Sequence, residues 1–464
     1  MKIALAQIEI VSNPELNAEK ILNFTERAKS LGADVVIFPE VEFNADKFIV
    51  KNSALPFRLG ENKIRDEKFS AQAESSKCPL IYVNAVGIKW RGKTLYTLDG
   101  QSAVYNSRGE IVKLLPAYEE TLEVFDLEEI DKLPALEVAE LDETAQIYRA
   151  IYYGTKKFLQ QININKVVIG ISGGIDSAVA AALYTKILGA ENVYLVNMPS
   201  VFNSATTKNL SEQLAKNLGC KYFVIPIQES VDFTVKQLED AQIEVSSFVK
   251  ENIQARDRSS RILAAVAASV DGVFTCNANK AESTIGYATL YGDAAGFFCA
   301  LADLWKFQVY ALANYFNEKI YKREVIPQGI IDIVPSAELS TAQNVDEGKG
   351  DPVKYPYHDY LFRALMEDDA APEDILSWYV DGELENKIGC EVGLVKKYFA
   401  TPNDFVADLE RWWKLFKGMA VAKRMQTPPV LAVSKRAYGA DFPETQNPPY
   451  FTKAYQSLKE KILR

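Results

Sequence analysis

Histidine is almost absent from this chain, and cysteine is scarce. Among 464 residues there is one histidine, His358, and there are five cysteines, which lie far apart and form no Cys-x-x-Cys pair. Zinc sites need several closely spaced cysteine and histidine ligands, and disulfide frameworks need paired cysteines. We therefore expect neither kind of site in this protein.

Long apolar runs and an excess of positive charge are also missing. No stretch reaches the roughly 20 apolar residues of a membrane-spanning helix, and the opening MKIALAQIEIV lacks the cleavage region of a signal peptide. The formal net charge of −10 argues against a broad nucleic-acid surface, although a local basic pocket would still accept a phosphorylated small molecule. We expect a cytoplasmic protein with no membrane or nucleic-acid partner.

The most informative stretch is Lys166 to Ala182, KVVIGISGGIDSAVAAA. Its β-branched run predicts a buried strand, and residues 178–188 predict a helix that packs back on it. Between them lies SGGIDS, residues 172–177, which is neither the lysine-bearing phosphate loop GxxxxGK[ST] nor GxGxxG. One interpretation is an ordinary strand-to-helix turn, with glycines for geometry and Asp176 as a helix cap.

A phosphate-binding loop is the second interpretation of the same hexapeptide. Gly173 and Gly174 would bring backbone N–H groups against a phosphate at a helix start, and Ser172 and Ser177 would donate hydroxyls to it. Asp176 would repel a phosphate directly, so its useful role there is to hold a Mg²⁺ ion.

Strands and helices alternate after this loop. The pattern predicts a strand at 193–200, a helix at 206–219 and a strand at 221–227, followed by a helix at 259–269 and a strand at 272–278. Such alternation predicts a parallel, doubly wound sheet with ligands at the carboxyl ends of its strands. Met198 to Ser204 would lie at that edge, near adenine and ribose, although an ordinary loop explains Ser204 equally well.

The hexapeptide SGGIDS resembles the SGGxDS signature of the PP-loop ATP pyrophosphatases, and further segments resemble NAD synthetases in the order that family has them. These segments are ENIQAR (251–256), NANKAE (277–282), IGYATLYGD (285–293), Lys306 in DLWKFQVYALA, PSAEL (335–339) and the basic stretch containing Lys423 and Arg424. On composition alone, Arg256 and Arg258 would be a solvated face and Lys306 an exposed helix lysine. From about residue 140 onward the resemblance is nearly continuous.

The resemblance implies a role for each matching residue. Asp176, Glu282 and Lys306 would be catalytic, with Mg²⁺ on the two carboxylates. ATP would contact Gly170, Ser172, Gly173, Gly174, Asp176, Ser177, Met198, Ser204, Lys306 and Ser336. The second substrate would contact Asn252, Gln254, Arg256, Asn277, Asp293 and Lys423.

The activity implied by the resemblance is that of a ligase that consumes ATP. The carboxylate of nicotinic acid adenine dinucleotide (deamido-NAD) would attack the α-phosphate of ATP, pyrophosphate would leave, and ammonia would then displace AMP to give NAD. Two alternatives stay open: amidation of nicotinate mononucleotide, and a regulatory nucleotide-binding subunit without turnover. The family also implies a homo-oligomer, at least a dimer.

The first 138 residues resemble a shortened nitrilase-type glutaminase domain, a domain in which a glutamate, a lysine and a cysteine release ammonia from glutamine. Glu40 in FPE matches the glutamate, but no lysine or cysteine lies in the family's motifs. Cys78 is the available thiol, yet Pro79 follows it and has no N–H to contribute to an oxyanion hole. We expect an inactive glutaminase remnant at 1–138 and an ATP pyrophosphatase domain with a helical tail at 139–464. Free ammonia, or another protein, would then be the nitrogen donor.

Four more local features can be predicted. A helix at 143–161 would link the two parts, and residues 94–115 would form a hairpin with turn signals at Asp99-Gly100 and at 107–109. Residues 251–258 would open the helix at 259–269. Residues 344–364, rich in Gly, Pro and charge, would form a mobile lid ordered by His358.

Overall fold

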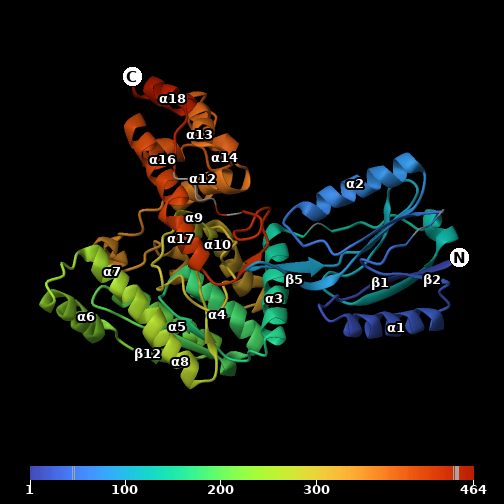
Figure 1. The fold of residues 1–464 in the computed structure, drawn as a ribbon, viewed down its shortest axis with the longest axis horizontal. Coiled ribbons are helices and arrows are strands. Elements are labelled where there is room, and N and C mark those ends of the chain that lie inside the picture. The colour runs from blue at the N-terminus through green and yellow to red at the C-terminus, as the bar shows by residue number, and fades with distance from the viewer. Residues whose placement is uncertain (44, 46, 140, 443, 445–448) are drawn as a thin grey trace. The chain divides into compact units, whose positions relative to one another are not determined.

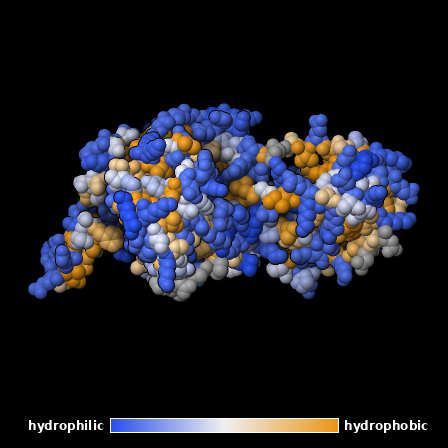
Figure 2. All heavy atoms as spheres, turned by 90° about the horizontal axis from the view of Figure 1, so that it is seen from above, coloured by the Kyte–Doolittle hydropathy of each residue, from blue (hydrophilic) through white to orange (hydrophobic). Residues whose placement is uncertain are grey.

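The computed structural model describes residues 1–43, 45, 47–139, 141–442, 444 and 449–464 (Figure 1). They form two compact units: unit 1 contains Met1–Arg91, Leu95–Phe158 and Ala432–Lys435, and unit 2 contains Gly92–Thr94, Leu159–Leu431 and Arg436–Arg464. Within these described ranges, every helix is too short or too polar to cross a membrane. Hydrophilic side chains cover most of the face drawn in Figure 2, with apolar ones in smaller patches.

Unit 1 is built from strands whose alternating side chains serve two cores. In β1 (Lys2–Gln7), Ile3 and Leu5 point into a core shared with β4 (Leu80–Asn84), whereas Ala6 packs with Phe24 of α1 (Pro14–Ser30). On the β4 side, Leu80 and Tyr82 pack instead with Phe69 of α2. Because successive side chains of a strand point to opposite faces, one core lies between the sheets and one lies under each helix. Figure 1 shows α1 and α2 on opposite sides of the strands.

Two sheets of unit 1 have the strand orders β2-β1-β9 and β3-β4-β7-β8. The predicted turn at 107–109 does join the antiparallel pair β7 and β8, whereas the turn at Asp99-Gly100 joins strands of different sheets. At the Asp99-Gly100 turn only glycine fits, because Gln7 would lie 2.3 Å from a Cβ at position 100 and φ there is +70°. The other elements of unit 1 are β2 (Val35–Ile37), β3 (Ile49–Ser53), α2 (Glu61–Ser76), β5 (Val86–Arg91), β6 (Thr94–Asp99), β7 (Ala103–Tyr105), β8 (Ile111–Leu114), β9 (Thr121–Asp126), the 3₁₀ turn η1 (Leu127–Lys132) and most of α3 (Glu143–Gln161).

Unit 2 contains a parallel four-stranded sheet in the order β12-β11-β10-β13, which confirms the predicted fold class. From β10 (Val167–Gly170) the chain moves to β11 and β12 on one side and returns to β13 on the other. The strand order therefore reverses at β10, and in such sheets ligands bind at the carboxyl ends of the strands beside that point. The strand β13 is only Val273–Phe274, shorter than predicted.

Helices surround this sheet and continue into a helical region. The sheet elements are β11 (Val193–Asn197), β12 (Lys221–Val224), α4 (Ile175–Leu188), η2 (Ala190–Asn192), α5 (Ala205–Leu218) and α6 (Gln228–Asp240). The later helices are α9 (Lys280–Ile285), α10 (Lys306–Tyr315), the π-helix η4 (Phe316–Ile320), α11 (Gln328–Asp332), α12 (Tyr355–Glu367), α13 (Pro372–Val380), α14 (Leu384–Ile388), α15 (Leu394–Tyr398), α16 (Pro402–Lys417), α17 (Met419–Gln426) and α18 (Lys453–Leu463). The strand β14 (Val430–Ala432) crosses the division between the units.

Residues 251–258, predicted to open a helix at 259–269, lie within a longer helical stretch that begins before them. The helix α7 begins at Ser247 and ends at Arg256, a π-helix η3 covers Asp257–Leu263, and α8 (Ala264–Ser269) continues it. Ser246 caps the start by accepting a hydrogen bond from Val249 N, so the start signal lies earlier than predicted. This start puts residues 251–258 on helical faces, with Asn252 and Arg256, four apart, on the same side.

The predicted mobile lid is wrong for its second half. From Tyr355 to Glu367 the chain forms α12, with Pro356 in its first turn and apolar residues at helical spacing such as Tyr357, Leu361 and Leu365 packed in the core. His358 is fully buried in this helix; its Nδ1 accepts from Lys354 N and its Nε2 lies 2.8 Å from Asp408 Oδ2. Only residues 344–354 remain loop-like, with the 3₁₀ turn η6 (Val345–Glu347) after η5 (Thr341–Gln343).

Candidate functional site

The SGGIDS loop lies between β10 and α4 in a conformation that only glycine allows. Gly173 has φ +87°, and a Cβ there would meet the carbonyl oxygen of Thr207 at 2.4 Å. The hydroxyl of Ser172 accepts from Gly174 N at 3.2 Å, and that of Ser177 donates to Gly174 O at 3.0 Å. The loop is thereby held open at the N-terminus of α4, where backbone N–H groups favour anions.

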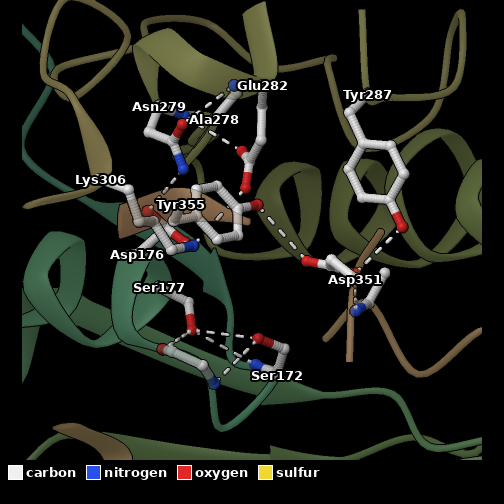
Figure 3. A network of polar contacts seen from close by, with 12 residues as sticks. Ser172, Asp176, Ser177, Ala278, Asn279, Glu282, Tyr287, Lys306, Asp351 and Tyr355 are labelled. Atoms are coloured by element: carbon white, nitrogen blue, oxygen red, sulfur yellow. Dashed lines mark hydrogen bonds and ion pairs between the residues drawn. The ribbon is translucent and has the colours of Figure 1, made fainter. Parts of the chain in front are cut away.

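One cation joins two carboxylates immediately above this loop (Figure 3). The ammonium Nζ of Lys306 lies 2.5 Å from Asp176 Oδ2 and 3.6 Å from Glu282 Oε1. The aromatic ring of Tyr355 lies beside it, with its centroid 4.9 Å from Nζ. Residues from three helices, α4, α9 and α10, therefore meet at one buried charge cluster.

Asn279 fixes the positions of Asp176 and Glu282 relative to each other. Its Nδ2 donates to Asp176 Oδ1 at 3.0 Å, and its Oδ1 accepts from Glu282 N at 3.0 Å. The Glu282 carboxylate in turn accepts from Asn279 N, so Asn279 and Glu282 form the capping box of α9. The spacing Asn-x-x-Glu is a sequence signal for such a cap, and it would have pointed to Asn279 as a further site residue.

Burial and repulsion set the protonation of this cluster. Desolvation, together with the negative charge of Asp176, raises the pKa of Glu282 above its ordinary range. Desolvation would lower the pKa of Lys306, but the attraction of Asp176 and Glu282 outweighs it, and the net shift of that pKa is upward. Lys306 therefore stays charged and neutralises part of the carboxylate pair.

Asp351 closes one side of the site. Its carboxylate accepts hydrogen bonds from Tyr287 Oη at 3.0 Å, from Tyr355 Oη at 3.4 Å and from Ala337 N at 3.0 Å (Figure 3). Burial raises its pKa. These contacts connect the loop before α12 to the wall that carries Glu282.

Two adjoining cavities meet at the cluster. The first, of about 240 Å³, has an apolar end that includes Met198, Ala255 and Leu263, and the second, of about 160 Å³, contains Gly173, Lys306 and Asp351. Both are lined by Ser172, Asp176 and Glu282. Gly170 keeps the first cavity clear, since a Cβ there would stand only 3.1 Å from Leu263 and 3.2 Å from Met198.

Most of the predicted site residues line these cavities, from segments far apart in sequence. They are Gly170, Ser172, Gly173, Gly174, Asp176, Ser177, Met198, Asn277, Glu282, Asp293, Lys306 and Ser336. Asp293 accepts from Thr289 N at 2.6 Å, and burial raises its pKa. The structure thus assembles the phosphate loop, the carboxylate pair and the lysine around one space.

Five predicted residues lie outside the cavity lining. Ser204 is buried as the N-cap of α5, and Gln254 is buried with its Nε2 donating to Leu339 O, so both hold the protein chain itself. Asn252 donates to Phe248 O within α7. Arg256 and Lys423 donate to Leu290 O and Gly286 O, both in the segment 285–293 that carries Asp293.

Arg258 lines the first cavity, although composition alone placed it on a solvated face. Its Nε donates to Met198 O at 3.0 Å and its Nη2 to Asn203 Oδ1 at 3.1 Å. Desolvation lowers its pKa to about 10 despite the attraction of Asp293, Asp257 and Glu338, so it remains a cation at neutral pH. Ala255 of α7 and Arg258 of η3 line the cavity, whereas Arg256 is exposed.

In unit 1, the candidate glutaminase residues have separate neighbours. Glu40 has φ +55°, its side chain is 49% exposed, and its Oε1 lies 3.7 Å from Nζ of the exposed Lys89. Cys78 is half-buried, with its thiol directed to Lys47 O at 3.5 Å. Neither set of contacts brings a carboxylate, a lysine and a thiol together.

Comparison with known proteins gives the family. The model of the NAD synthase family matches residues 147–392, more than half of the chain. The chain is 32% identical over 400 residues to a glutamine-dependent NAD(+) synthetase of Synechocystis sp., covering 84% of this chain and 64% of that protein. It is 33% identical over 344 residues to the enzyme of that name from Rhodobacter capsulatus, covering 72% of this chain and 61% of the relative.

Solved structures agree in fold. A glutamine-dependent NAD(+) synthetase from Cytophaga hutchinsonii aligns over 100% of both chains with a TM-score of 0.76 at 14% identity. The enzyme from Acinetobacter baumannii in complex with ADP aligns over 96% of this chain and 72% of that one, with a TM-score of 0.57 at 24% identity. The chain spans less than two thirds of the two sequence relatives above. On the family match and the motifs assembled at the cavities, the chain belongs to the NAD synthase family.

Proposed function

We propose that this chain catalyses the ATP-dependent amidation of deamido-NAD to NAD, with release of AMP and pyrophosphate. The observation that carries the proposal is the cluster of Lys306, Asp176 and Glu282 directly above a glycine loop at a helix N-terminus. A loop of this kind binds phosphate, and a cation beside it offsets the charge that develops when pyrophosphate leaves.

In the first step, the nicotinate carboxylate of the substrate attacks the α-phosphate of ATP. The new bond is between a carboxylate oxygen and phosphorus, the bond to the β-phosphate oxygen breaks, and pyrophosphate carries away the electron pair. The Ser172 and Ser177 hydroxyls and the N–H groups of the loop would bind the phosphate oxygens, and Lys306 and Ser336 would hold the departing group. These residues act by positioning and by charge, and no nucleophile on the protein is needed.

In the second step, ammonia attacks the acyl carbon of the adenylate. A C–N bond forms, the C–O bond to AMP breaks, and the nitrogen loses a proton to solvent. Asp293, on the cavity wall, would position the substrate, and Arg256 and Lys423 would contact the part of the dinucleotide that extends past the cavity. Asn277 would provide a neutral hydrogen-bonding side chain beside the reacting group.

The carboxylate pair fits a Mg²⁺ ion. Asp176 and Glu282 present oxygen donors close enough that one raises the pKa of the other, a repulsion that a divalent cation would relieve. When bound, Mg²⁺ would supply charge stabilisation for the phosphates. In the present structure Lys306 takes part of that role.

We further propose that ammonia, rather than glutamine, provides the nitrogen. In support, Glu40 is half-exposed and paired with Lys89, and Cys78 precedes a proline and contacts a main-chain carbonyl. Unit 1 would then serve structure or assembly in a homo-oligomer, at least a dimer.

The test is a coupled assay of NAD and AMP formation from ATP, deamido-NAD and ammonium. We expect one AMP and one pyrophosphate for each NAD. Pyrophosphate release that does not depend on deamido-NAD would contradict the proposal, and a higher kcat/KM for nicotinate mononucleotide would favour that substrate instead. No pyrophosphate with either substrate would favour a regulatory subunit.

A further inference from the structure

Glu338 lies between α11 and η5, in a segment that lines part of both cavities. Its neighbours Ser336, Ala337 and Leu339 line the first cavity, but the Glu338 side chain is only 2% exposed and points away from it. The carboxylate accepts from Thr207 Oγ1 at 2.7 Å, from Ser204 N at 3.1 Å and from Asn203 Nδ2 at 3.3 Å. It therefore fixes the cavity wall to the N-terminus of α5, where a negative charge is favourable.

The backbone at Glu338 is strained, which indicates that these contacts determine its position. Its φ is +48°, a conformation that costs a non-glycine residue free energy and persists where the surroundings hold it. Glu338 N donates to Ser336 Oγ at 3.2 Å, and that hydroxyl donates to Gln343 O at 2.6 Å. The Glu338 carboxylate, bound to the N-terminus of α5, and the left-handed backbone at Glu338 together fix the position of the Ser336 hydroxyl.

Asn203 connects the same carboxylate to the cation in the cavity wall. Its Nδ2 donates to Glu338, while its Oδ1 accepts from Arg258 Nη2 at 3.1 Å and from Ser200 N at 2.8 Å. The other acceptor of Arg258, Met198 O, is neutral. The side chain of Asn203 therefore links the Arg258 cation to the Glu338 carboxylate through two hydrogen bonds.

We propose that Glu338 is a positioning residue for the nucleotide: its carboxylate holds Ser336 and, through Asn203, Arg258 in place to bind ATP in the first cavity. The inference rests on the proposed function only in taking ATP as the ligand of that cavity. Breaking the anchor should weaken nucleotide binding although Glu338 itself touches no ligand, because hydrogen bonds to a charged group contribute more than neutral ones.

The test measures binding of α,β-methylene-ATP to the full-length chain by calorimetry, with thermal unfolding as a parallel readout. Glu338→Gln keeps the shape and removes the charge, and we expect the Kd to rise about tenfold. Glu338→Asp keeps the charge on a shorter side chain and should recover part of the affinity. Glu347→Gln is the matched control, an exposed acid of the neighbouring 3₁₀ turn, and should leave the Kd unchanged.

A double-mutant cycle distinguishes positioning from a structural role. Arg258→Lys should weaken binding alone, and added to Glu338→Gln it should cost much less than the product of the two single effects. Strictly multiplicative effects, or a lower unfolding temperature with an unchanged Kd in Glu338→Gln, would overturn the proposal. If Glu338→Gln does not fold, Asn203→Ala tests the same connection. If the wild-type chain binds the analogue but makes no NAD, the proposed function fails while this inference is still tested.

Discussion

Lys306 lies 2.5 Å from Asp176, closer to it than to Glu282, and the ion pair joins the start of α10 to the phosphate loop. The same side chain that would hold a departing phosphate thereby also holds the loop before nucleotide binds. If Mg²⁺ binds the two carboxylates as proposed, this ammonium would compete with it. This competition makes the contribution of Lys306 measurable in the absence of substrate.

Replacing Lys306 by glutamine should strengthen Mg²⁺ binding and at the same time slow turnover. In nucleotide-free protein, Lys306→Gln should bind Mg²⁺ more tightly, because the carboxylates lose their resident positive charge. Turnover should nevertheless fall by roughly 10²–10³-fold, the usual loss when one preorganised charge is removed from a transition state. Lys319→Gln, an exposed lysine just beyond α10, is the control; weaker Mg²⁺ binding in Lys306→Gln would contradict the account.

Gly173 should tolerate no side chain, whereas Gly348 provides a matched comparison. Both have positive φ, but a Cβ at Gly173 meets Thr207 O at 2.4 Å and one at Gly348 meets nothing within 4 Å. Each alanine variant should lose roughly 1–3 kcal/mol of stability from backbone strain. Only Gly173→Ala should also lose ATP binding, measured by calorimetry; equal ATP affinities in the two variants would show that the close approach at Gly173 is unimportant.

The single histidine gives a testable pH dependence of stability. Burial lowers the pKa of His358 below its ordinary 6.5, although Asp408 raises it. The unfolded chain then binds more protons than the folded one near and below pH 6.5, so the free energy of unfolding should fall as pH drops through that range. The slope from this group is at most about 1.4 kcal/mol per pH unit.

Denaturant unfolding between pH 5 and 8, compared with His358→Gln, isolates this contribution from that of the acidic groups. The glutamine variant should show a shallower decline toward low pH. An unchanged slope would mean that His358 does not lose its proton on folding.

The thiol of Cys78 should not be needed for NAD formation from ammonium. Because Cys78 contacts Lys47 O and Glu40 is paired with Lys89, Cys78→Ala should change the rate of ammonium-driven NAD formation by less than about twofold, the scale of a surface substitution. Glutamine should give no activity in either protein. Robust glutamine-driven activity that Cys78→Ala abolishes would establish Cys78 as a nucleophile.

Local patterns predicted the parts of the site that are continuous in sequence. The turn at Gly173 and the alternation of strands and helices follow from short-range sterics and periodicity. The start of the helix was placed too late: Ser246, ahead of residues 251–258, caps α7. Composition also did not distinguish the exposed Arg256 from Arg258, which lines the first cavity.

Long-range contacts could not be predicted from local patterns either. The anchor between Glu338 and the N-terminus of α5 joins residues more than 130 positions apart, and nothing near Glu338 in the sequence announces it. Likewise, apolar spacing around His358 indicates a buried helix, but the Gly, Pro and charged residues just before it favoured a loop. Tertiary packing decided both cases.

The most direct test of the central claim is a competition between nitrogen donors. The full-length chain is incubated with ATP, Mg²⁺ and deamido-NAD in the presence of unlabelled ammonium and amide-¹⁵N-glutamine, and the mass of the NAD formed is measured together with AMP. The account predicts unlabelled NAD and AMP in equal amounts. NAD carrying ¹⁵N would contradict the assignment of ammonia as donor, and the absence of NAD would contradict the synthetase activity itself.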